Sequence, residues 1–333
     1  MTVDRVLLAA PRGFCAGVEM AIKALAWMVR HYEPPVYCYH EIVHNRLVVD
    51  RFRERGVMFV DSLDDVPDGA PLMLSAHGSP PEVVRAAAAK GGFVVDAVCP
   101  LVTKVHHEVK VRAGKGYTVL YVGHAGHDEA VGTMAVAPES IALVETEDDV
   151  ATLADPGRPV ALLAQTTLSH HDWAGVLDAA RDRFPDLWMP GRSDLCFATT
   201  NRQSALQAIV PRADAVVVIG SANSSNTVAL AKVAEATAAD VPGRTIRVLR
   251  VNGPDELPGD LAGVVAVTAG ASAAEEVVAA VIARLAPRLG VEEISITDED
   301  EYFPPPRALR EHMTADELAD DRSLAASDVL TAL

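Results

Sequence analysis

The chain has 333 residues, half of them hydrophobic, and a formal net charge of −17 at pH 7. This length predicts two or three compact domains with buried cores. The charge argues against nucleic acid or an anionic membrane as a partner, and no apolar run approaches the roughly 18 to 20 residues of a membrane span. No signal-peptide pattern is visible at the N-terminus, so we expect a cytoplasmic protein.

Three segments each place one cysteine at the beginning of a helical pattern. Residues 6–17 contain Cys15, residues 94–100 contain Cys99, and residues 192–198 contain Cys196. In each case the pattern predicts a strand that leads to the cysteine and a helix that follows it.

Strand-like apolar runs that end in small polar loops follow the cysteines, two after each. They cover residues 36–44, 72–78, 119–127, 160–167, 216–226 and 264–272. From Cys15 to His44 the offset is 29 residues, from Cys99 to His127 it is 28, and from Cys196 to Ser224 it is 28. The regular spacing predicts a threefold internal repeat of α/β units with mostly parallel sheets.

The repeat gives predicted boundaries for three pseudo-symmetric α/β domains. They are 1–98 with Cys15, 99–194 with Cys99, and 195–310 with Cys196, followed by an acidic tail at 311–333. We expect the tail to be mobile or a loosely attached helix. Ligands of parallel sheets bind beyond the carboxyl ends of the strands, where all six polar loops are expected. The alternative is that these loops are polar simply because such loops are polar in most α/β proteins. That alternative does not explain why one cysteine recurs at the same position of each repeat.

One cysteine from each of three domains indicates an iron–sulfur cluster rather than structural zinc, which normally takes four closely spaced ligands. A [4Fe-4S] cluster with only three cysteine ligands leaves one iron open to substrate. Ordinary buried thiols are the alternative interpretation. Cys38 lies within a strand-like run and has no counterpart in the other units, so we expect a core thiol there.

The polar loops are rich in groups that can bind a phosphate without Arg or Lys. The candidates are His44, His77, His127, Thr166, Ser224, Ser225, Asn226 and Ser272. The sequence has no P-loop motif and no dinucleotide-binding glycine motif. Glu129, two residues after His127, is a candidate proton donor, although a glutamate at a helix start also simply favours the helix dipole.

The chain closely resembles the 4-hydroxy-3-methylbut-2-enyl diphosphate reductase family up to about Arg310. The matching motifs are PRGFCAGV at 11–18, HEIVHNR at 40–46, SAHG at 75–78, CPLVTKVH at 99–106, GHAGH at 123–127, QTTLS at 165–169, CFATTNRQ at 196–203, NSSN at 223–226 and TAGAS at 268–272. One motif departs from the family, because His127-Asp128-Glu129 stands where the family usually has His-Pro-Glu.

The resemblance implies a trefoil-like arrangement of three domains around a [4Fe-4S] cluster held by Cys15, Cys99 and Cys196. It implies that His44, His77, His127, Ser224, Ser225, Asn226 and Ser272 bind the substrate diphosphate, with Thr166 and Glu129 near the substrate hydroxyl. The implied reaction is the last step of the non-mevalonate pathway of isoprene biosynthesis. The substrate hydroxyl binds the open iron and is removed reductively, giving isopentenyl and dimethylallyl diphosphates.

The sequence shows no flavin or nicotinamide motif, so the electrons are expected from an external one-electron donor such as ferredoxin or flavodoxin. Two alternatives stay open at this point. A cluster dehydratase of the quinolinate synthase type shares the three-cysteine, open-iron logic but would favour Arg or Lys in its loops. An iron–sulfur redox sensor would need a cluster but no diphosphate-binding residues.

Overall fold

The computed structural model describes residues 2–191 and 193–333, so Arg192, in the segment that leads to Cys196, lies outside the described residues. The chain forms two compact units. Unit 1 comprises Met1–Cys15, His44–Arg46 and Cys196–Glu301, and unit 2 comprises Ala16–Val43, Leu47–Leu195 and Tyr302–Leu333. The described residues contain three sheets with parallel strand pairing throughout, which confirms the predicted α/β class.

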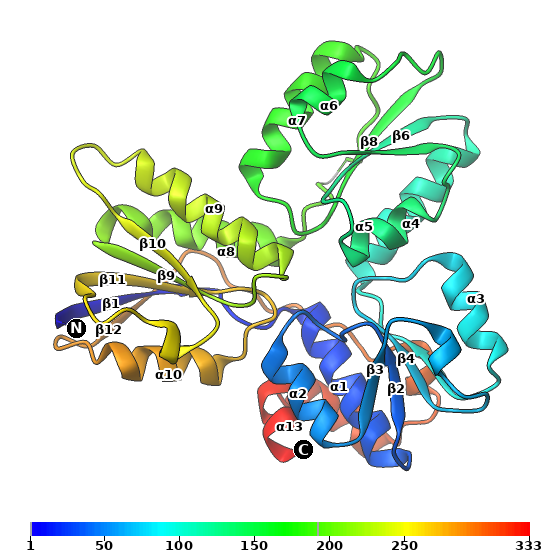
Figure 1. The fold of residues 1–333 in the computed structure, drawn as a ribbon, viewed down its shortest axis with the longest axis horizontal. Coiled ribbons are helices and arrows are strands. Elements are labelled where there is room, and N and C mark those ends of the chain that lie inside the picture. Colours follow the sequence, from blue (N-terminus) through cyan, green and yellow to red (C-terminus); the bar gives the residue numbers. More distant parts are fainter. Residues whose placement is uncertain (1, 192) are drawn as a thin grey trace. The chain divides into compact units, whose positions relative to one another are not determined.

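Unit 1 is built on a five-stranded sheet with the order β10-β9-β11-β1-β12 (Figure 1). The strands are β1 (Thr2–Ala10), β9 (Ala215–Ile219), β10 (Arg247–Val251), β11 (Ala262–Ala269) and β12 (Val291–Ser295). The main helices are α8 (Phe197–Ile209), α9 (Ser225–Ala239) and α10 (Glu275–Leu285).

Both faces of this sheet are buried by helices. Val6 of β1 belongs to the apolar cluster that includes Val278 of α10, whereas Leu7 belongs to the cluster that includes Leu206 of α8 and Leu230 of α9. Successive strand residues point to opposite faces. Burial on both sides therefore explains why the strands read as continuous apolar runs rather than alternating ones.

Unit 2 contains a four-stranded sheet, β3-β2-β4-β5, and a three-stranded sheet, β7-β6-β8. The strands are β2 (Val36–Tyr39), β3 (Val57–Val60), β4 (Leu72–Leu74), β5 (Val94–Asp96), β6 (Thr118–Val122), β7 (Ile141–Val144) and β8 (Val160–Ala164). The helices are α1 (Ala16–His31), α2 (Arg46–Glu54), α3 (Pro81–Ala89), α4 (Pro100–Gly114), α5 (Asp128–Met134), α6 (Glu147–Thr152), α7 (His170–Arg183), α11 (Arg307–Arg310), α12 (Ala315–Ser323) and α13 (Ala326–Ala332).

The strand pairing differs from the predicted division of the chain at β1. This strand falls within the predicted domain 1–98, but it pairs with β11 and β12 of unit 1. The backbone of β1 pairs with these two strands at its two edges, and its two apolar faces are buried by helices of unit 1. The boundaries 1–98, 99–194 and 195–310 otherwise remain a prediction.

The expected strand before Cys196 is not formed in the described residues of that segment. Residues 193–195 have no strand partner, and the nearest pairing is an isolated bridge between Trp188 and Ala161 of β8. Pro190 and Gly191 interrupt the segment, and the buried Asp194 accepts hydrogen bonds from Lys104 and from the Ala164 N–H instead. In this segment, hydrogen bonds to the Asp194 side chain thus take the place of backbone hydrogen bonds between strands.

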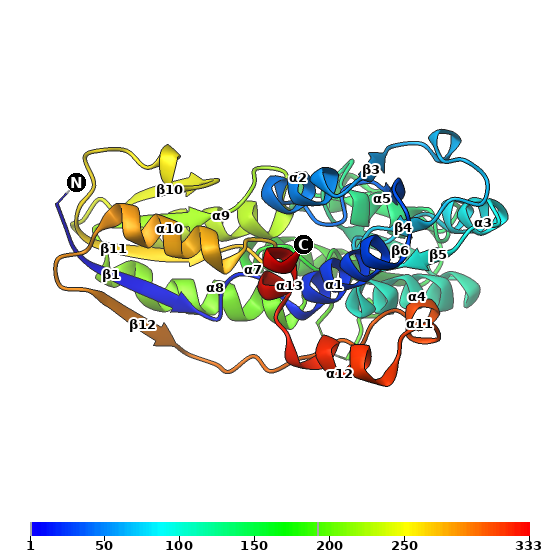
Figure 2. The ribbon, with the colours of Figure 1, turned by 90° about the horizontal axis from the view of Figure 1, so that it is seen from below.

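The acidic tail is more ordered than we expected. It forms α12 and α13, and α13 lies against α1 with Val329 and Leu330 buried (Figure 2). The Lys23 ammonium of α1 donates to the Asp321 carbonyl at 3.0 Å, and the Trp27 indole donates to Glu317 at 2.9 Å. Apolar burial on one helix face therefore outweighs the polar composition of the segment. Among the described residues, no helix combines the length and apolar character that crossing a bilayer requires.

The strand β12 forms one edge of the unit 1 sheet, next to β1 (Figure 2). Its side chains alternate between half-buried and exposed. Glu292 accepts hydrogen bonds from Arg5 at 2.9 Å and Arg212 at 2.7 Å, and Glu293 accepts one from Arg12 at 2.7 Å. The side chains of the edge strand β12 therefore form ion pairs with arginines of neighbouring segments.

Candidate active site

The predicted site residues are distributed over both units. Unit 1 carries Cys15, His44, Cys196, Ser224, Ser225, Asn226 and Ser272, and unit 2 carries Cys99, His77, His127, Glu129 and Thr166. Each set lies mainly in loops that follow strands or at helix starts, as the sequence predicts for ligand sites of parallel sheets.

In unit 1, two of the three predicted cluster ligands lie at helix starts. Cys15 directly precedes α1, and its N–H donates to the Ala271 carbonyl at 3.2 Å. Cys196 is the N-cap residue of α8, and its sulfur accepts the Thr199 N–H at 3.2 Å. Each cysteine therefore lies at the N-terminus of a helix, where the helix dipole favours negative charge.

Burial raises the pKa of the Cys196 thiol to about 12, with the neighbouring Cys15 as the next cause. Hydrogen bonds from Thr199 and the charge of Arg202 oppose this rise. A buried thiol with a raised pKa beside a second sulfur stays protonated unless a cation replaces the proton. This donor set therefore fits a thiolate-bound metal group.

A chain of hydrogen bonds connects the two cysteine segments of unit 1. The Thr199 hydroxyl lies 3.0 Å from the Cys196 sulfur and accepts the Asn226 amide N–H at 3.2 Å. The Asn226 carbonyl oxygen accepts the Ala271 N–H at 2.9 Å. Because Thr199 is fully buried and Asn226 is 3% exposed, water does not compete for these bonds.

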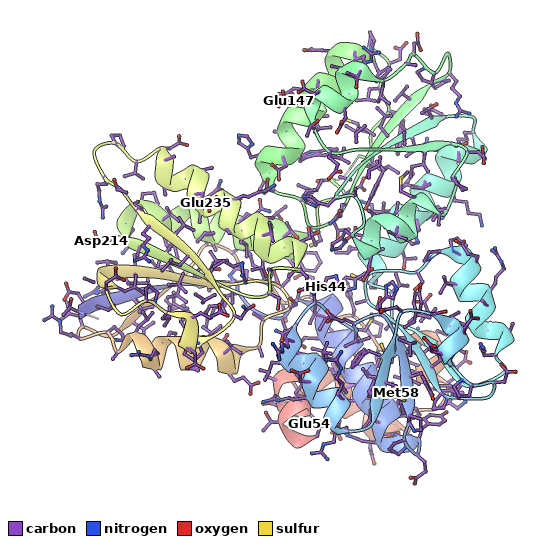
Figure 3. The ribbon with its side chains drawn as sticks, in the orientation of Figure 1. His44, Glu54, Met58, Glu147, Asp214 and Glu235 are labelled. Atoms are coloured by element: carbon purple, nitrogen blue, oxygen red, sulfur yellow. The ribbon has the colours of Figure 1, made fainter. Side chains whose placement is uncertain are left out.

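The loop after β11 supports the predicted diphosphate residues of unit 1. The Ser272 hydroxyl donates to the His44 carbonyl at 3.1 Å, and the Asn45 amide donates to the Ser272 carbonyl at 2.6 Å (His44 is labelled in Figure 3). Ser224 caps α9 by accepting the N–H of Thr227, and its hydroxyl lies 3.4 Å from that of Ser272. A Cβ atom at Gly270 would lie 2.1 Å from the Thr227 hydroxyl oxygen, so only glycine lets this loop approach the start of α9.

Arg202 of α8 binds the segment that precedes Cys15. It is 1% exposed and donates to the carbonyls of Gly13 at 2.8 Å and Phe14 at 3.3 Å. It also donates to Ala198 and to both carboxylate oxygens of Glu299 at 3.0 Å. All five guanidinium donors can be satisfied in this geometry, which fixes the Cys15 segment to the Cys196 helix.

In unit 2, Glu129 and Thr166 form a buried pair. One Glu129 carboxylate oxygen accepts the Thr166 N–H at 2.7 Å, and the other accepts the Thr166 hydroxyl at 2.9 Å. Glu129 is 2% exposed in the first turn of α5, and Thr166 follows β8. The two residues are thus brought together from neighbouring strand ends of one sheet.

Burial raises the pKa of Glu129 to about 7, and the nearby Asp194 adds to the rise. The two Thr166 hydrogen bonds act in the opposite direction. A carboxyl group with a pKa near neutrality can give up and regain a proton at physiological pH, as a general acid must.

The remaining unit 2 candidates surround the start of α5. His127 is the N-cap residue, and its Nδ1 accepts the Glu129 N–H at 3.2 Å, which places the proton of the neutral ring on Nε2. The His77 and His127 rings lie 5.9 Å apart in a T-shaped arrangement. Cys99 is the N-cap residue of α4, and its N–H donates to the Ala76 carbonyl at 3.0 Å.

Asp128, which stands where the family usually has proline, is in contact with His40. Its carboxylate lies 3.0 Å from His40 Nδ1, and this hydrogen bond is the main cause of the raised pKa of His40. His40 follows β2 and has a left-handed φ of 59°. An ion pair between α5 and the loop after β2 therefore occupies the position of the rigid proline ring.

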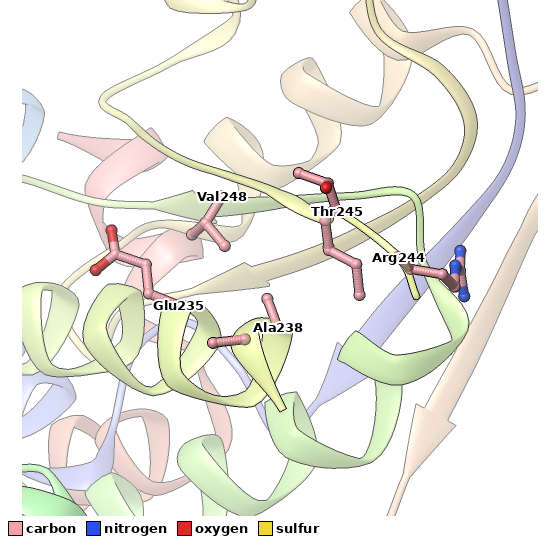
Figure 4. A pocket seen from close by; sticks show the side chains of 7 residues that line it. Glu235, Ala238, Arg244, Thr245 and Val248 are labelled. Atoms are coloured by element: carbon pink, nitrogen blue, oxygen red, sulfur yellow. The ribbon is translucent and has the colours of Figure 1, made fainter. Parts of the chain in front are cut away.

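A surface hollow in unit 1 lies away from these residues. Glu235, Ala238, Arg244, Thr245 and Val248 line it, at the end of α9 and the beginning of β10 (Figure 4). This is the amino end of the sheet, opposite the loops described above. The Arg244 guanidinium donates to the Ala213 carbonyl and to Asp214, so it is committed to local structure.

Comparison with protein-family models shows which family this chain belongs to. The model of the family described as LytB protein matches residues 6–286. The chain belongs to the LytB protein family. That span includes every predicted site residue, from Cys15 to Ser272.

Several curated relatives are named 4-hydroxy-3-methylbut-2-enyl diphosphate reductase. One from Rhodopirellula baltica is 47% identical over 93% of this chain and 97% of its own length. One from Chlamydia abortus is 44% identical over 92% of this chain and 99% of its own. A solved structure of the E-1-hydroxy-2-methyl-but-2-enyl-4-diphosphate reductase from Plasmodium falciparum is similar with a TM-score of 0.88 and 30% identity, covering 94% of this chain and 98% of that one. The sequence-based recognition of the family is confirmed.

The roles of the individual residues remain predictions. The contacts of several of them bear on these roles. Glu129 and Thr166, both of which the resemblance places near the substrate hydroxyl, are hydrogen-bonded to each other. Cys38 lies in β2 and is fully buried, and burial raises the pKa of its thiol, as expected of a core residue. Asn226, predicted to bind diphosphate, has one amide N–H and its carbonyl oxygen in bonds to Thr199 and Ala271.

Sequence reasoning missed Thr199, Arg202 and His40. Thr199 and Arg202 follow Cys196 by three and six residues in the motif CFATTNRQ, so helical spacing from Cys196 could have indicated Thr199. His40 begins the motif HEIVHNR at 40–46, which could have singled it out.

Asp128→Ala is expected to destabilise the start of α5 by about 1 kcal/mol at pH 6 and by less at pH 9. The pKa of His40 is raised in the folded protein, so this stabilisation is fully present below the unfolded value of 6.5 and is lost as the pH rises through the folded value. Urea unfolding at both pH values measures it. Asp148→Ala, in the exposed first turn of α6, is the matched control, and equal effects of both variants at both pH values would refute the His40 contact.

Proposed function

We propose that this chain reduces (E)-4-hydroxy-3-methylbut-2-enyl diphosphate to isopentenyl and dimethylallyl diphosphates, the last step of the non-mevalonate pathway. The observation that carries the proposal is the buried Glu129–Thr166 pair with a carboxyl pKa of about 7. It occurs in a chain that is 47% identical to a relative named as this reductase. The predicted cytoplasmic location rests on the sequence alone.

The cysteines support a [4Fe-4S] cluster as the cofactor, held by Cys15, Cys99 and Cys196. Cys15 lies close enough to Cys196 in unit 1 to disfavour ionisation of the Cys196 thiol, and the Thr199 N–H and hydroxyl contact the Cys196 sulfur. When bound, such a cluster supplies single electrons and a Lewis-acidic iron. The electrons would come from an external donor such as ferredoxin or flavodoxin.

The protein itself supplies a proton and binds the anion. Glu129, protonated at about pH 7, gives its proton through the Thr166 hydroxyl to the leaving hydroxyl of the substrate. Departure as water rather than hydroxide lowers the barrier to C–O cleavage. The Ser224 hydroxyl and the N-terminus of the 15-residue helix α9 offer donors for diphosphate without a lysine or arginine.

An anaerobic assay tests the proposal. Reconstituted protein is given the diphosphate substrate and a chemical reductant, and products are analysed by mass spectrometry. Consumption of two electrons per substrate, with formation of both five-carbon diphosphates, is expected. A dehydratase of the quinolinate synthase type would consume no reductant, and a redox sensor would show a cluster spectrum without products. The relatives' names favour neither alternative.

Cys38→Ala is expected to leave the iron content unchanged, because Cys38 lies in the middle of β2 and is fully buried. The small cavity costs on the order of 1 kcal/mol. Cys196→Ala is the matched comparison and should lose most of the iron. Iron per protein and absorbance after reconstitution measure both variants, and loss of iron from Cys38→Ala would overturn its assignment as a core thiol.

A further inference from the structure

Thr199 directs two hydrogen bonds at one sulfur of the predicted cluster site. Its N–H donates to the Cys196 sulfur at 3.2 Å, and its hydroxyl oxygen lies 3.0 Å from the same sulfur. The N–H bond is the ordinary cap of α8, with cysteine in the place of serine. The hydroxyl bond is additional and depends on where the hydroxyl proton points.

Asn226 determines the direction of that proton. Its carbonyl oxygen must be the atom that faces the Ala271 N–H, at 2.9 Å, because an amide nitrogen there would place two donors together. The Asn226 amide nitrogen then faces the Thr199 hydroxyl oxygen at 3.2 Å and donates to it. A hydroxyl that accepts from Asn226 has its own proton available for the Cys196 sulfur.

We propose that Thr199, oriented by Asn226, is a positioning residue that raises the reduction potential of the cluster by donating its hydroxyl proton to the Cys196 sulfur. This proposal rests on the proposed iron–sulfur function. A reduced cluster carries more negative charge on its sulfurs than an oxidised one, so a fixed donor stabilises the reduced state more. Burial of Thr199 and Asn226 makes the bond stronger than it would be in water.

The same chain of bonds also reaches the backbone of the second cysteine of unit 1, Cys15. Ala271 donates its N–H to Asn226 and accepts the Cys15 N–H at its carbonyl oxygen. Asn226 therefore couples the orientation of the Thr199 hydroxyl to the position of the Cys15 backbone. Arg202 also favours the charged form of Cys196, but it remains unchanged in the variants below and shifts all of them equally.

The test is a redox titration of reconstituted protein, monitored by electron paramagnetic resonance, with no substrate present. Thr199→Val keeps the shape and the N–H bond but removes the hydroxyl. We expect the ratio of reduced to oxidised cluster at a fixed solution potential to fall about tenfold, which corresponds to about 59 mV more negative for one electron. Thr199→Ser should restore the wild-type potential.

Thr200→Val is the matched control, because the Thr200 hydroxyl on the same helix donates to the Phe197 carbonyl at 3.0 Å. Its potential should equal that of the wild type. Asn226→Ala frees the Thr199 hydroxyl to rotate and should give part of the Thr199→Val shift, so it tests the same bond if Thr199→Val takes up little iron.

The outcomes separate this proposal from the proposed function. Wild-type protein that forms no cluster on reconstitution would overturn both. A wild-type cluster whose potential is unchanged in Thr199→Val, or in Asn226→Ala where the first variant cannot be loaded, would overturn the role of Thr199 alone. A positive shift in Thr199→Val would do the same.

Discussion

Glu129→Gln is expected to lower kcat by about 10²- to 10⁴-fold while the protein keeps its cluster and its affinity for diphosphate. Glutamine retains an acceptor for the Thr166 N–H, now 2.7 Å from the carboxylate, but has no proton to give at neutral pH. The loss should therefore appear in kcat rather than in KM. Steady-state kinetics and the cluster absorbance of the variant measure it, and turnover near that of the wild type would remove Glu129 from the acid role.

The pH dependence of the wild type provides a second measurement on the same residue. Activity that needs protonated Glu129 should decline as the pH rises through about 7. The raised pKa also favours folding below the unfolded value of 4.5, and this contribution, on the order of 3 kcal/mol, is lost between pH 4.5 and about 7. Glutamine does not titrate, so Glu129→Gln should gain stability relative to the wild type at pH 8.

Glu147→Gln is the matched control for the helix dipole. Glu147 also lies in the first turn of a helix, α6, but its side chain is exposed (labelled in Figure 3). Its substitution should change neither kcat nor the pH profile. If both glutamate variants lost activity equally, Glu129 would be acting through the dipole of α5 rather than as a proton donor.

Arg202→Met should destabilise unit 1 by about 3–5 kcal/mol, because it leaves the carboxylate of Glu299, whose side chain is 10% exposed, without its principal partner. The carbonyls of Gly13 and Phe14 lose their donors as well. Urea unfolding of the metal-free protein measures the loss. Hydrogen exchange of peptides from 2–15 and 196–209 localises it, since both segments should exchange faster.

Two further variants serve as controls for Arg202→Met. One also neutralises its partner Glu299, and the other removes an arginine whose side chain is exposed. Arg202→Met combined with Glu299→Gln removes the uncompensated charge and should recover part of the stability. Arg288 pairs with Asp4 in the same unit, but its side chain is 67% exposed, so Arg288→Met should cost less than about 1 kcal/mol. Equal effects of the Arg202 and Arg288 substitutions would show that the guanidinium does not fix the Cys15 segment.

The sequence was sufficient for the strands that end in the polar loops and for the family, but not for β3, β7, β10 and β12, and the strand expected before Cys196 is not formed in the described residues. Continuous apolar runs such as 216–219 could be assigned because burial on both faces of a parallel sheet leaves few polar residues in them. The cysteines at helix starts were also predictable, since an apolar run followed by a 3.6-residue period marks such a junction.

The partners of each strand could not be predicted. β1 pairs with β11, about 260 residues further along the chain, because nothing in a two-sided apolar strand specifies its neighbours. The bonds of Arg202 to Glu299, 97 residues away, are equally invisible in the sequence. In the acidic tail, by contrast, Thr314 and Glu317 form a capping box with recognisable spacing, which marks the beginning of α12.

The edge strand β12 bears on the solubility of the protein in acid. An unpaired strand edge invites a second molecule to add a strand, and charged side chains on the edge oppose this. Arg212 and Arg5 hold the pKa of Glu292 below its usual range. Glu292 therefore stays ionised after most surface carboxylates have become neutral, and the edge keeps its protection against strand addition as the solution is acidified.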